Sequence, residues 1–352
     1  MVSFQRIAIV GAGAVGSFIG GLLQQAFSHQ GHGSSPQLTL VARGTHAHAM
    51  QQEGLHVVGT MQGASLPCHV RVHVVNHVAE LPPQDLIFIT VKGFSLEQAA
   101  QEIAPLCHAD TVIVPIMNGL SYWYLHGKPL YTPDGHPITS LQGVDPHGHI
   151  ARCLPLSQTL GAVIHVPAEL IAPGRVQVLN DARLFLGEPD PTLGISSRVQ
   201  AVAALFAPTG LCVKPMADIR QEVWRKLLIN LSLAPTSVLT EATYGDMLRD
   251  PTLASWLFDL ASEAKAVGLA ASEDIALLEV ESIHAKVLET IADHRSSMLQ
   301  DALRGKPLEL GVIVESVVHL GVQLGVSCPT MMCTLAMVQL LTKMRDARRG
   351  EA

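Results

Sequence analysis

The feature that most constrains this chain is its opening, where an apolar run leads directly into a glycine turn. Residues 6–10 (RIAIV) have the composition of a buried strand, and glycines follow at positions 11, 13 and 16. Gly11 permits a tight turn, Gly13 leaves room for a pyrophosphate to approach the backbone, and Gly16 lets the next helix pack closely on the strand. Free N–H groups at the helix start bind phosphate. A purely structural glycine turn is the alternative. The predicted dinucleotide site comprises Gly11, Ala12, Gly13, Ala14, Val15 and Gly16.

The end of the second predicted strand, residues 38–42, indicates which dinucleotide binds. A site for NAD usually places an acidic residue there to hold the ribose 2′-hydroxyl, whereas this chain has Arg43. A guanidinium is a planar, permanently charged fork that matches the oxygens of a 2′-phosphate. The sequence therefore predicts NADP(H), unless Arg43 is only a solvated residue at a strand end.

The first part of the chain alternates between predicted strands and helices. Strands are expected at residues 54–58, 70–74, 85–91 and 111–116, with a helix from 95 to 106. Such alternation predicts a parallel, doubly wound sheet, which binds ligands at the carboxyl ends of its strands. The residues expected at that edge are Gly11, Arg43, Lys92 and Asn118.

Further along the chain the pattern changes twice. Residues 121–158 contain many Tyr, Trp, His, Pro and Gly residues, which predicts an inserted loop or hairpin. Strands are then expected at 161–166, 174–179 and 182–186, followed by a helix at 196–206. Beyond residue 216 only helical periodicity is found, at 221–233, 253–267, 272–292, 308–324 and 330–344. We therefore expect a Rossmann domain over 1–216 and an all-helical domain over 217–352.

Composition narrows the classes of function. The net charge is −7, and no basic block is present to bind nucleic acid. Apolar runs are shorter than the roughly 20 residues of a membrane helix, and the first strand leaves no room for a signal peptide, so we expect a cytoplasmic protein. The 17 histidines include no HExxH motif, so no metal site is predicted. Six scattered cysteines fit reduced thiols better than disulfides: Cys68, Cys107, Cys153, Cys212, Cys328 and Cys333.

A second polar constellation lies in the helical part. Lys226 and Asn230 are four residues apart and so project from one face of a helix that is otherwise largely apolar. A lysine and an amide on one face could hold a keto acid, although an exposed lysine is usually only solvated. Residues 296–301 (SSMLQD) and Glu309 supply further polar groups beside an apolar helix.

Taken together, these motifs make the chain resemble the ketopantoate reductase (2-dehydropantoate 2-reductase) family almost from end to end. The shared segments are the glycine turn, VARG at 41–44, VK at 91–92, PIMNG at 115–119, WRKLLIN at 224–230, SSMLQD at 296–301, and Glu309. The resemblance implies a Rossmann domain followed by a helical domain like that of 6-phosphogluconate dehydrogenase relatives. It also implies NADPH-dependent reduction of 2-dehydropantoate to pantoate, a small-molecule substrate.

The resemblance also implies roles for individual residues. Lys226 is expected to be the general acid, and Asn230 and Ser297 to contact the substrate. Asn118 is expected to contact the cofactor and the active site, and Glu309 to position the cofactor or the lysine. These roles agree with the chemistry, because hydride arriving at a keto carbon leaves negative charge on oxygen that an ammonium stabilises and protonates.

The chain also departs from the family pattern. Ala234 stands where many relatives have a second asparagine one turn after Asn230, and Tyr244 occupies another position that can supply an asparagine. Residues 311–314 and the insertion at 121–158 differ as well. The substrate is therefore left open between ketopantoate and another 2-keto acid or carbonyl compound, and a non-catalytic NADP-binding sensor is a third alternative. The apolar C-terminal helices indicate a homodimer, unless they only fill the core of their own domain.

Overall fold

The computed structural model describes residues 3–29, 35–66, 68–179 and 181–350. The chain divides into two compact units. Unit 1 comprises Met1–Met117, His126–Lys128 and Gly148–Ile219, and unit 2 comprises Asn118–Leu125, Pro129–His147 and Arg220–Ala352.

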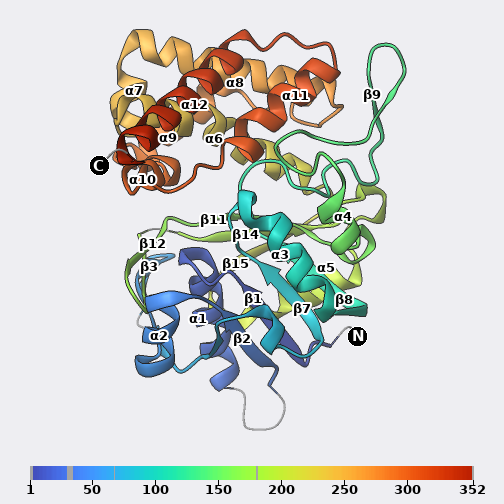
Figure 1. The fold of residues 1–352 in the computed structure, drawn as a ribbon, viewed down its shortest axis with the longest axis vertical. Coiled ribbons are helices and arrows are strands. Elements are labelled where there is room, and N and C mark those ends of the chain that lie inside the picture. Colours follow the sequence, from blue (N-terminus) through green and yellow to red (C-terminus); the bar gives the residue numbers. More distant parts are fainter. Residues whose placement is uncertain (1–2, 30–34, 67, 180, 351–352) are drawn as a thin grey trace. The chain divides into compact units, whose positions relative to one another are not determined.

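Unit 1 is built on a parallel sheet of five strands in the order β6-β2-β1-β7-β8 (Figure 1). Ile7 and Ile9 of β1, Leu40 of β2, Phe88 of β7 and Val114 of β8 are fully buried. The predicted doubly wound α/β fold is thereby confirmed. The strands are β1 (Arg6–Val10), β2 (Gln37–Val41), β6 (His73–Val75), β7 (Gln84–Ile89) and β8 (Cys107–Pro115), and the helices are α1 (Ala14–Ser28), α2 (Gly44–Glu53) and α3 (Leu96–Ile103).

Two smaller sheets complete unit 1. One has the order β12-β13-β3-β4, with β5 also paired to β3, and the other has the order β11-β14-β15. Helix α1 packs against both β2 and β3, which explains why it is apolar around most of its circumference. The elements are β3 (Leu55–Met61), β4 (Ala64–Ser65), β5 (Cys68–Val70), β11 (Gly161–His165), β12 (Ala168–Ala172), β13 (Arg175–Val178), β14 (Arg183–Gly187), β15 (Cys212–Met216), α4 (His149–Cys153) and α5 (Ser197–Leu205).

One predicted strand of unit 1 is divided in the structure. The run at 70–74 was expected to form a single strand, but β5 ends at Val70 and pairs with β3, while β6 begins at His73 and pairs with β2. The chain changes sheets at Arg71 and Val72, and alternation along the sequence cannot show which strand each part will join. Strands β12 and β15 were not predicted.

Unit 2 is mainly helical, and its helices run from yellow to red in Figure 1. Helix α6 continues to Thr240 although Pro235 lies inside it, so it is longer than the predicted 221–233. Helix α9 begins at Val280 rather than near 272, where Ser272 has a positive φ of 57° that interrupts a helix. The helices are α6 (Arg220–Thr240), α7 (Tyr244–Arg249), α8 (Pro251–Ala270), α9 (Val280–Ile291), α10 (Ser297–Leu303), α11 (Ser316–Gln323) and α12 (Pro329–Gly350).

A π-helical turn, Gly311–Glu315, leads directly into α11. Much of the segment predicted as an insertion of the first domain belongs to unit 2 and docks on this turn. Leu120, just before this segment, donates from its N–H to Val312 O of the turn at 2.9 Å, and Gln142 within the segment donates from its N–H to His319 Nδ1 of α11 at 3.2 Å. These contacts join residues about 180 positions apart, so local patterns could not assign the segment. It includes a hairpin of β9 (Leu130–Tyr131) and β10 (Pro137–Ile138).

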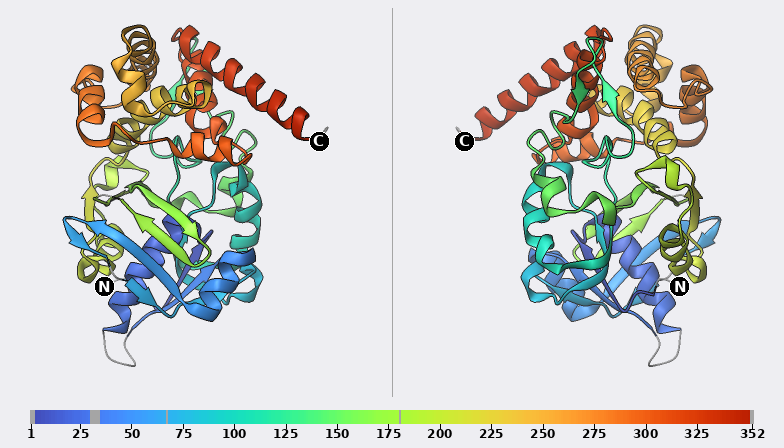
Figure 2. Two further views of the ribbon diagram at one scale, coloured as in Figure 1. Left: turned by 90° about the vertical axis from the view of Figure 1, so that its left-hand side faces the viewer. Right: turned by 90° about the vertical axis from the view of Figure 1, so that its right-hand side faces the viewer.

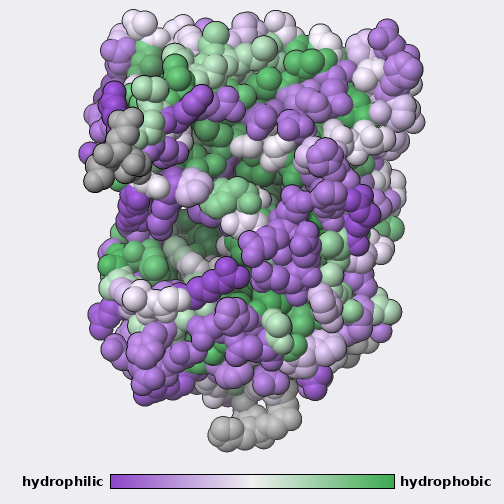
Figure 3. All heavy atoms as spheres, in the orientation of Figure 1, coloured by the Kyte–Doolittle hydropathy of each residue, from purple (hydrophilic) through white to green (hydrophobic). Residues whose placement is uncertain are grey.

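Apolar side chains reach the surface over the helices of unit 2 (Figure 3). They include Val322 of α11 and Met332 and Leu340 of α12, each more than half exposed. None of the helices in the described ranges combines the length and the hydropathy that crossing a membrane requires.

Candidate active site

The predicted glycine turn follows β1 closely. Gly11 has a φ of +93°, and a Cβ atom there would lie 2.7 Å from Val91 Cγ1 and 2.8 Å from Val91 N. Gly11 N and Ala12 N both donate to Val41 O, at 3.2 and 2.9 Å. The turn is therefore held against the ends of the two neighbouring strands, β2 and β7, in a conformation that only glycine adopts without strain.

Gly13 and Gly16 have different surroundings. A Cβ on Gly16 would lie 2.9 Å from Gly11 O, so the start of α1 packs directly on the turn. A Cβ on Gly13 would meet nothing closer than 3.9 Å, so the space above it is open. Gly13 is the N-cap of α1, and because glycine has no side chain, no capping side chain occupies this helix start. An open cradle at an uncapped helix start has the geometry that a pyrophosphate requires.

A buried relay that was not predicted connects this turn to α2. Gly174 N donates to His46 Nδ1 at 2.9 Å, so this nitrogen carries no proton and the other ring nitrogen does. His46 Nε2 then donates to Ser17 Oγ at 2.9 Å, and Ser17 Oγ donates to Ala12 O at 3.1 Å. Burial lowers the pKa of His46, which favours this neutral form. The relay fixes α2, which begins next to Arg43, relative to the glycine turn.

Arg43 and Lys92 lie at the carboxyl ends of β2 and β7. Arg43 is the N-cap of α2, its side chain is 65% exposed, and Nη2 lies 3.5 Å from Glu102 Oε2. Such an exposed ion pair is weak, so the guanidinium can exchange this partner for a phosphate. Lys92 is half-buried and follows Val91, the residue that contacts Gly11.

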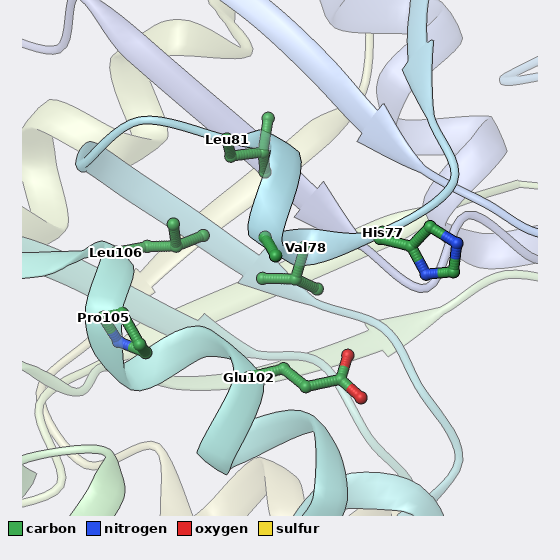
Figure 4. Close-up of a pocket in the computed structure, with 7 residues that line it drawn as sticks. His77, Val78, Leu81, Glu102, Pro105 and Leu106 are labelled. Carbon is green, nitrogen blue, oxygen red and sulfur yellow. The ribbon is translucent and has the colours of Figure 1, made fainter.

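A hollow in unit 1 lies beside Glu102 (Figure 4). Its wall is mainly apolar, with the Glu102 carboxylate and the His77 ring at its edge. None of the predicted site residues lines this hollow. Its one link to the predicted cofactor site is Glu102, which lines the hollow and pairs with Arg43. Its lining residues are His77, Val78, Ala79, Leu81, Glu102, Pro105 and Leu106.

In unit 2, α6 presents Lys226 and Asn230 one turn apart. Both residues are half-buried, whereas Leu227, Leu228 and Leu231 beside them are at most 1% exposed. Lys226 and Asn230 are therefore partly accessible on one face of this helix, and Arg225 beside them is 50% exposed. Ala234 continues this face by one turn and is buried.

The amino end of α6 is anchored by a buried aromatic and ionic cluster. Tyr124 Oη donates to Glu273 Oε1 at 2.6 Å and accepts from Trp224 Nε1 at 3.0 Å. Arg220 Nη2 donates to Tyr124 O at 2.9 Å, and Arg220 Nε lies 4.0 Å from Glu273 Oε1. Burial and the Glu273 carboxylate raise the pKa of Tyr124 well above its ordinary value. This cluster holds the helix that carries Lys226, and no motif in the sequence indicated it.

Asn118 and Glu309 form a direct pair within unit 2. Asn118 Nδ2 donates to Glu309 Oε2 at 3.1 Å, and Glu309 is only 7% exposed. Asn118 was predicted on the edge of the first domain's sheet, but it clusters with unit 2 because Leu120 N bonds to Val312 O just beyond Glu309. Gly119, between them, has a φ of +75° and packs against the same carbonyl group.

The two serines at the start of α10, the N-cap Ser296 and the first helical residue Ser297, have different surroundings. Ser296 is buried and caps the helix by accepting from Leu299 N at 3.0 Å, and its hydroxyl lies 2.6 Å from Ser237 Oγ of α6. Ser297, the predicted substrate contact, is exposed. The Ser237–Ser296 bond, which was not predicted, ties α10 to the helix that carries Lys226.

Tyr244 is a packing residue in this structure. Its ring meets the His294 ring edge to face, with centroids 5.2 Å apart, and it belongs to an apolar cluster with Leu233, Met247 and Leu257. Burial raises the pKa of its hydroxyl far above the ordinary value of 10.0. Ala234 and Tyr244 are both buried, and neither side chain carries an amide group.

Comparisons with known proteins agree with this arrangement. The family descriptions "Ketopantoate reductase PanE/ApbA" and "Ketopantoate reductase PanE/ApbA C terminal" match residues 7–122 and 218–342. A 2-dehydropantoate 2-reductase of Mesorhizobium japonicum is 32% identical over 340 residues, covering 96% of this chain and 97% of the relative. A ketopantoate reductase-type structure from Ralstonia solanacearum has 35% identity and a TM-score of 0.83, covering 98% and 99% of the two chains.

A more distant likeness concerns the fold alone. A structure of D-mandelate dehydrogenase with NADH and anilino(oxo)acetate has 19% identity and a TM-score of 0.78, covering 96% of this chain and 98% of that one. With both family segments matched in order, and with relatives aligned over nearly the whole length, the chain belongs to the ketopantoate reductase PanE/ApbA family of oxidoreductases.

Proposed function

We propose that this chain is an NADPH-dependent reductase that converts 2-dehydropantoate to pantoate, the reaction that supplies pantoate for pantothenate and coenzyme A synthesis. The observation that carries the proposal is that Lys226 and Asn230 lie partly exposed on one face of a helix whose leucines are buried. The family membership and the 2-dehydropantoate 2-reductase relatives support it. We place the enzyme in the cytoplasm and propose a homodimer, the state described for a Staphylococcus aureus relative.

The cradle described above fits a nicotinamide dinucleotide, which supplies a hydride when bound. Gly11, Ala12, Gly13, Ala14, Val15 and Gly16 would hold its pyrophosphate. Arg43 would pair with the 2′-phosphate that distinguishes NADP from NAD, and Lys92 would bind at the same edge.

The residues of unit 2 then carry out the proton chemistry. As the keto carbon is reduced, negative charge develops on its oxygen, and the Lys226 ammonium stabilises this charge and donates the proton. Asn230 and Ser297 hold the acid, and the Asn118–Glu309 pair orients the groups around the lysine. A sensor without turnover would need no such proton donor.

The assay that tests the reaction follows NADPH absorbance with 2-dehydropantoate. Replacing Lys226 by Ala should lower kcat by about 10²–10⁴-fold, the usual contribution of a positioned acid. Lys306→Ala, an exposed lysine of the same unit, is the matched control and should keep full activity. Oxidation of NADPH by no keto acid would refute the enzyme proposal, and activity surviving in Lys226→Ala would refute the role of that residue.

Cofactor preference is tested separately by binding. Arg43→Ala should weaken NADP⁺ binding by about tenfold or more and leave NAD⁺ binding unchanged, because only NADP⁺ carries the 2′-phosphate. Arg175→Ala removes an exposed arginine elsewhere in unit 1 and should change neither affinity. Equal losses for both dinucleotides in Arg43→Ala would contradict the assignment.

Ala234 and Tyr244 favour a second candidate, a reductase of a different 2-keto acid. The turn after Asn230 presents a methyl group instead of an amide, so the site makes fewer hydrogen bonds to a hydroxylated substrate. A panel of 2-dehydropantoate, 2-ketoisovalerate, pyruvate and phenylglyoxylate separates the two candidates by kcat/KM. The highest value with an apolar or aromatic acid would select the second.

A further inference from the structure

The side chain of Arg43 has an acidic partner on α3. Figure 2 shows α2 (blue), which begins next to Arg43, and α3 (teal) on the same side of unit 1. Within the described ranges, Glu102 is the only residue that hydrogen-bonds to the Arg43 side chain, through one contact of 3.5 Å between Nη2 and Oε2. A guanidinium has five N–H donors and binds a well-placed carboxylate with two of them. Arg43 is therefore oriented by Glu102 but held only weakly.

The Glu102 carboxylate is positioned by its own helix. Gln98, one turn earlier on α3, donates from Nε2 to Glu102 Oε1 at 3.1 Å, and the other oxygen, Oε2, faces Arg43. The Glu102 side chain is 34% exposed, at the edge of the hollow in Figure 4. When the guanidinium turns away, the carboxylate keeps Gln98 and gains water as a partner. Breaking this ion pair therefore costs little, although the cost is not zero.

A 2′-phosphate bound at this edge would compete with Glu102 for the same guanidinium. The space beside Arg43 is open, because a Cβ atom on Gly44 would meet no other atom within 4 Å. A phosphate monoester carries about 1.5–2 negative charges at pH 7, so it binds a guanidinium more strongly than a carboxylate does. It must nevertheless displace Glu102 first. NAD has no charged group at this position and leaves the ion pair intact.

We propose that Glu102 is a specificity-determining residue that competes with the 2′-phosphate for Arg43. It weakens the binding of NADP(H), leaves that of NAD(H) unchanged, and so reduces the preference for NADP(H). This inference rests on the proposed function, in which Arg43 binds the 2′-phosphate. Because an exposed ion pair changes an equilibrium constant by up to about fivefold, we expect an effect of roughly two- to fivefold.

The first test measures the affinities of the full chain for NADP⁺ and NAD⁺ by calorimetry. Glu102→Gln should tighten NADP⁺ binding roughly two- to fivefold and leave NAD⁺ binding unchanged. Glu53→Gln makes the same chemical change at an exposed residue at the far end of α2 and should alter neither affinity. An NADP⁺ affinity that is unchanged or weaker in Glu102→Gln, or an equal gain for both dinucleotides, would overturn the proposal.

The second test asks whether Glu102 acts through Arg43. In the Arg43→Ala background, Glu102→Gln should no longer tighten NADP⁺ binding, because no guanidinium is left to compete for. A gain of the same size with and without Arg43 would show simple charge repulsion and would overturn the competition.

The same measurements keep this proposal distinguishable from the proposed function. If Arg43→Ala weakens both dinucleotides equally, the cofactor assignment and this inference both fail. If Arg43→Ala weakens only NADP⁺ and Glu102→Gln has no effect, the cofactor assignment stands and this inference alone is wrong.

Discussion

Replacing Tyr124 by Phe tests how the helix that carries Lys226 is anchored. The change keeps the ring and removes only the hydroxyl, which donates to Glu273 at 2.6 Å and accepts from Trp224 at 3.0 Å. Tyr124, Trp224 and the Glu273 side chain are all at most 2% exposed, so water cannot replace the lost partner. The variant therefore leaves a buried indole N–H unsatisfied and deprives a buried carboxylate of its hydrogen bond.

The expected loss follows from these two contacts. A hydrogen bond to a charged group contributes about 1.5–3 kcal/mol, and an orphaned buried donor costs about 1–3 kcal/mol. Arg220 stays near Glu273 in the variant and still partly compensates the charge of the buried carboxylate. We therefore expect unit 2 to lose roughly 3–5 kcal/mol of unfolding free energy.

Tryptophan fluorescence in urea measures this loss directly. All three tryptophans of the chain, at positions 123, 224 and 256, lie in unit 2, so the signal reports the unfolding of that unit alone. Tyr131→Phe makes the same chemical change at a residue that is 56% exposed and should shift stability by less than about 0.5 kcal/mol. A loss below about 1 kcal/mol in Tyr124→Phe would refute the view that this hydroxyl holds the cluster together.

Three further predictions concern the turns and the buried histidines. Gly16→Ala places a Cβ 2.9 Å from the carbonyl oxygen of the glycine turn and should weaken NADP⁺ binding at least tenfold by calorimetry; unchanged affinity would contradict the cradle. Burial lowers the pKa of His46 and His284 below 6.5, so the unfolded chain binds more protons, and the melting temperature should fall as pH drops through 6.5. His46→Gln should reduce this fall in melting temperature. A wild-type melting temperature that does not change with pH in this range would contradict the role given to the buried histidines. Gly143→Ala, at a φ of +78° and with its Cβ 2.5 Å from Gly311 O, should cost unit 2 about 2 kcal/mol or more in urea, and an unchanged midpoint would count against the docking of this segment.

The parts of the fold that sequence reasoning predicted are those set by local rules. A buried strand, a glycine turn and a helix start appear within eleven residues, and the contacts of Gly11 and Gly16 show why no other residue fits there. Lys226 and Asn230 share a face because their spacing fixes it on any helix.

The parts that could not be predicted depend on contacts between distant residues. The assignment of Asn118 to unit 2 depends on a bond from Leu120 to Val312, and the Ser237–Ser296 bond joins two helices 59 residues apart. The His46 relay requires Gly174 N, which no pattern near His46 could indicate. Such partners become visible only when the backbone has brought them together.

The π-helical turn at Gly311–Glu315 has a consequence for how members of this family are aligned and recombined. Neighbouring residues on an α-helix are about 100° apart, so removing one residue from this turn would restore regular winding and rotate everything after it by that angle. The buried Val317 and Leu320 of α11 would then turn away from the core. A chimera that joins α11 from a relative must therefore conserve the residue count between Glu309 and Ser316, however well the flanking sequences match.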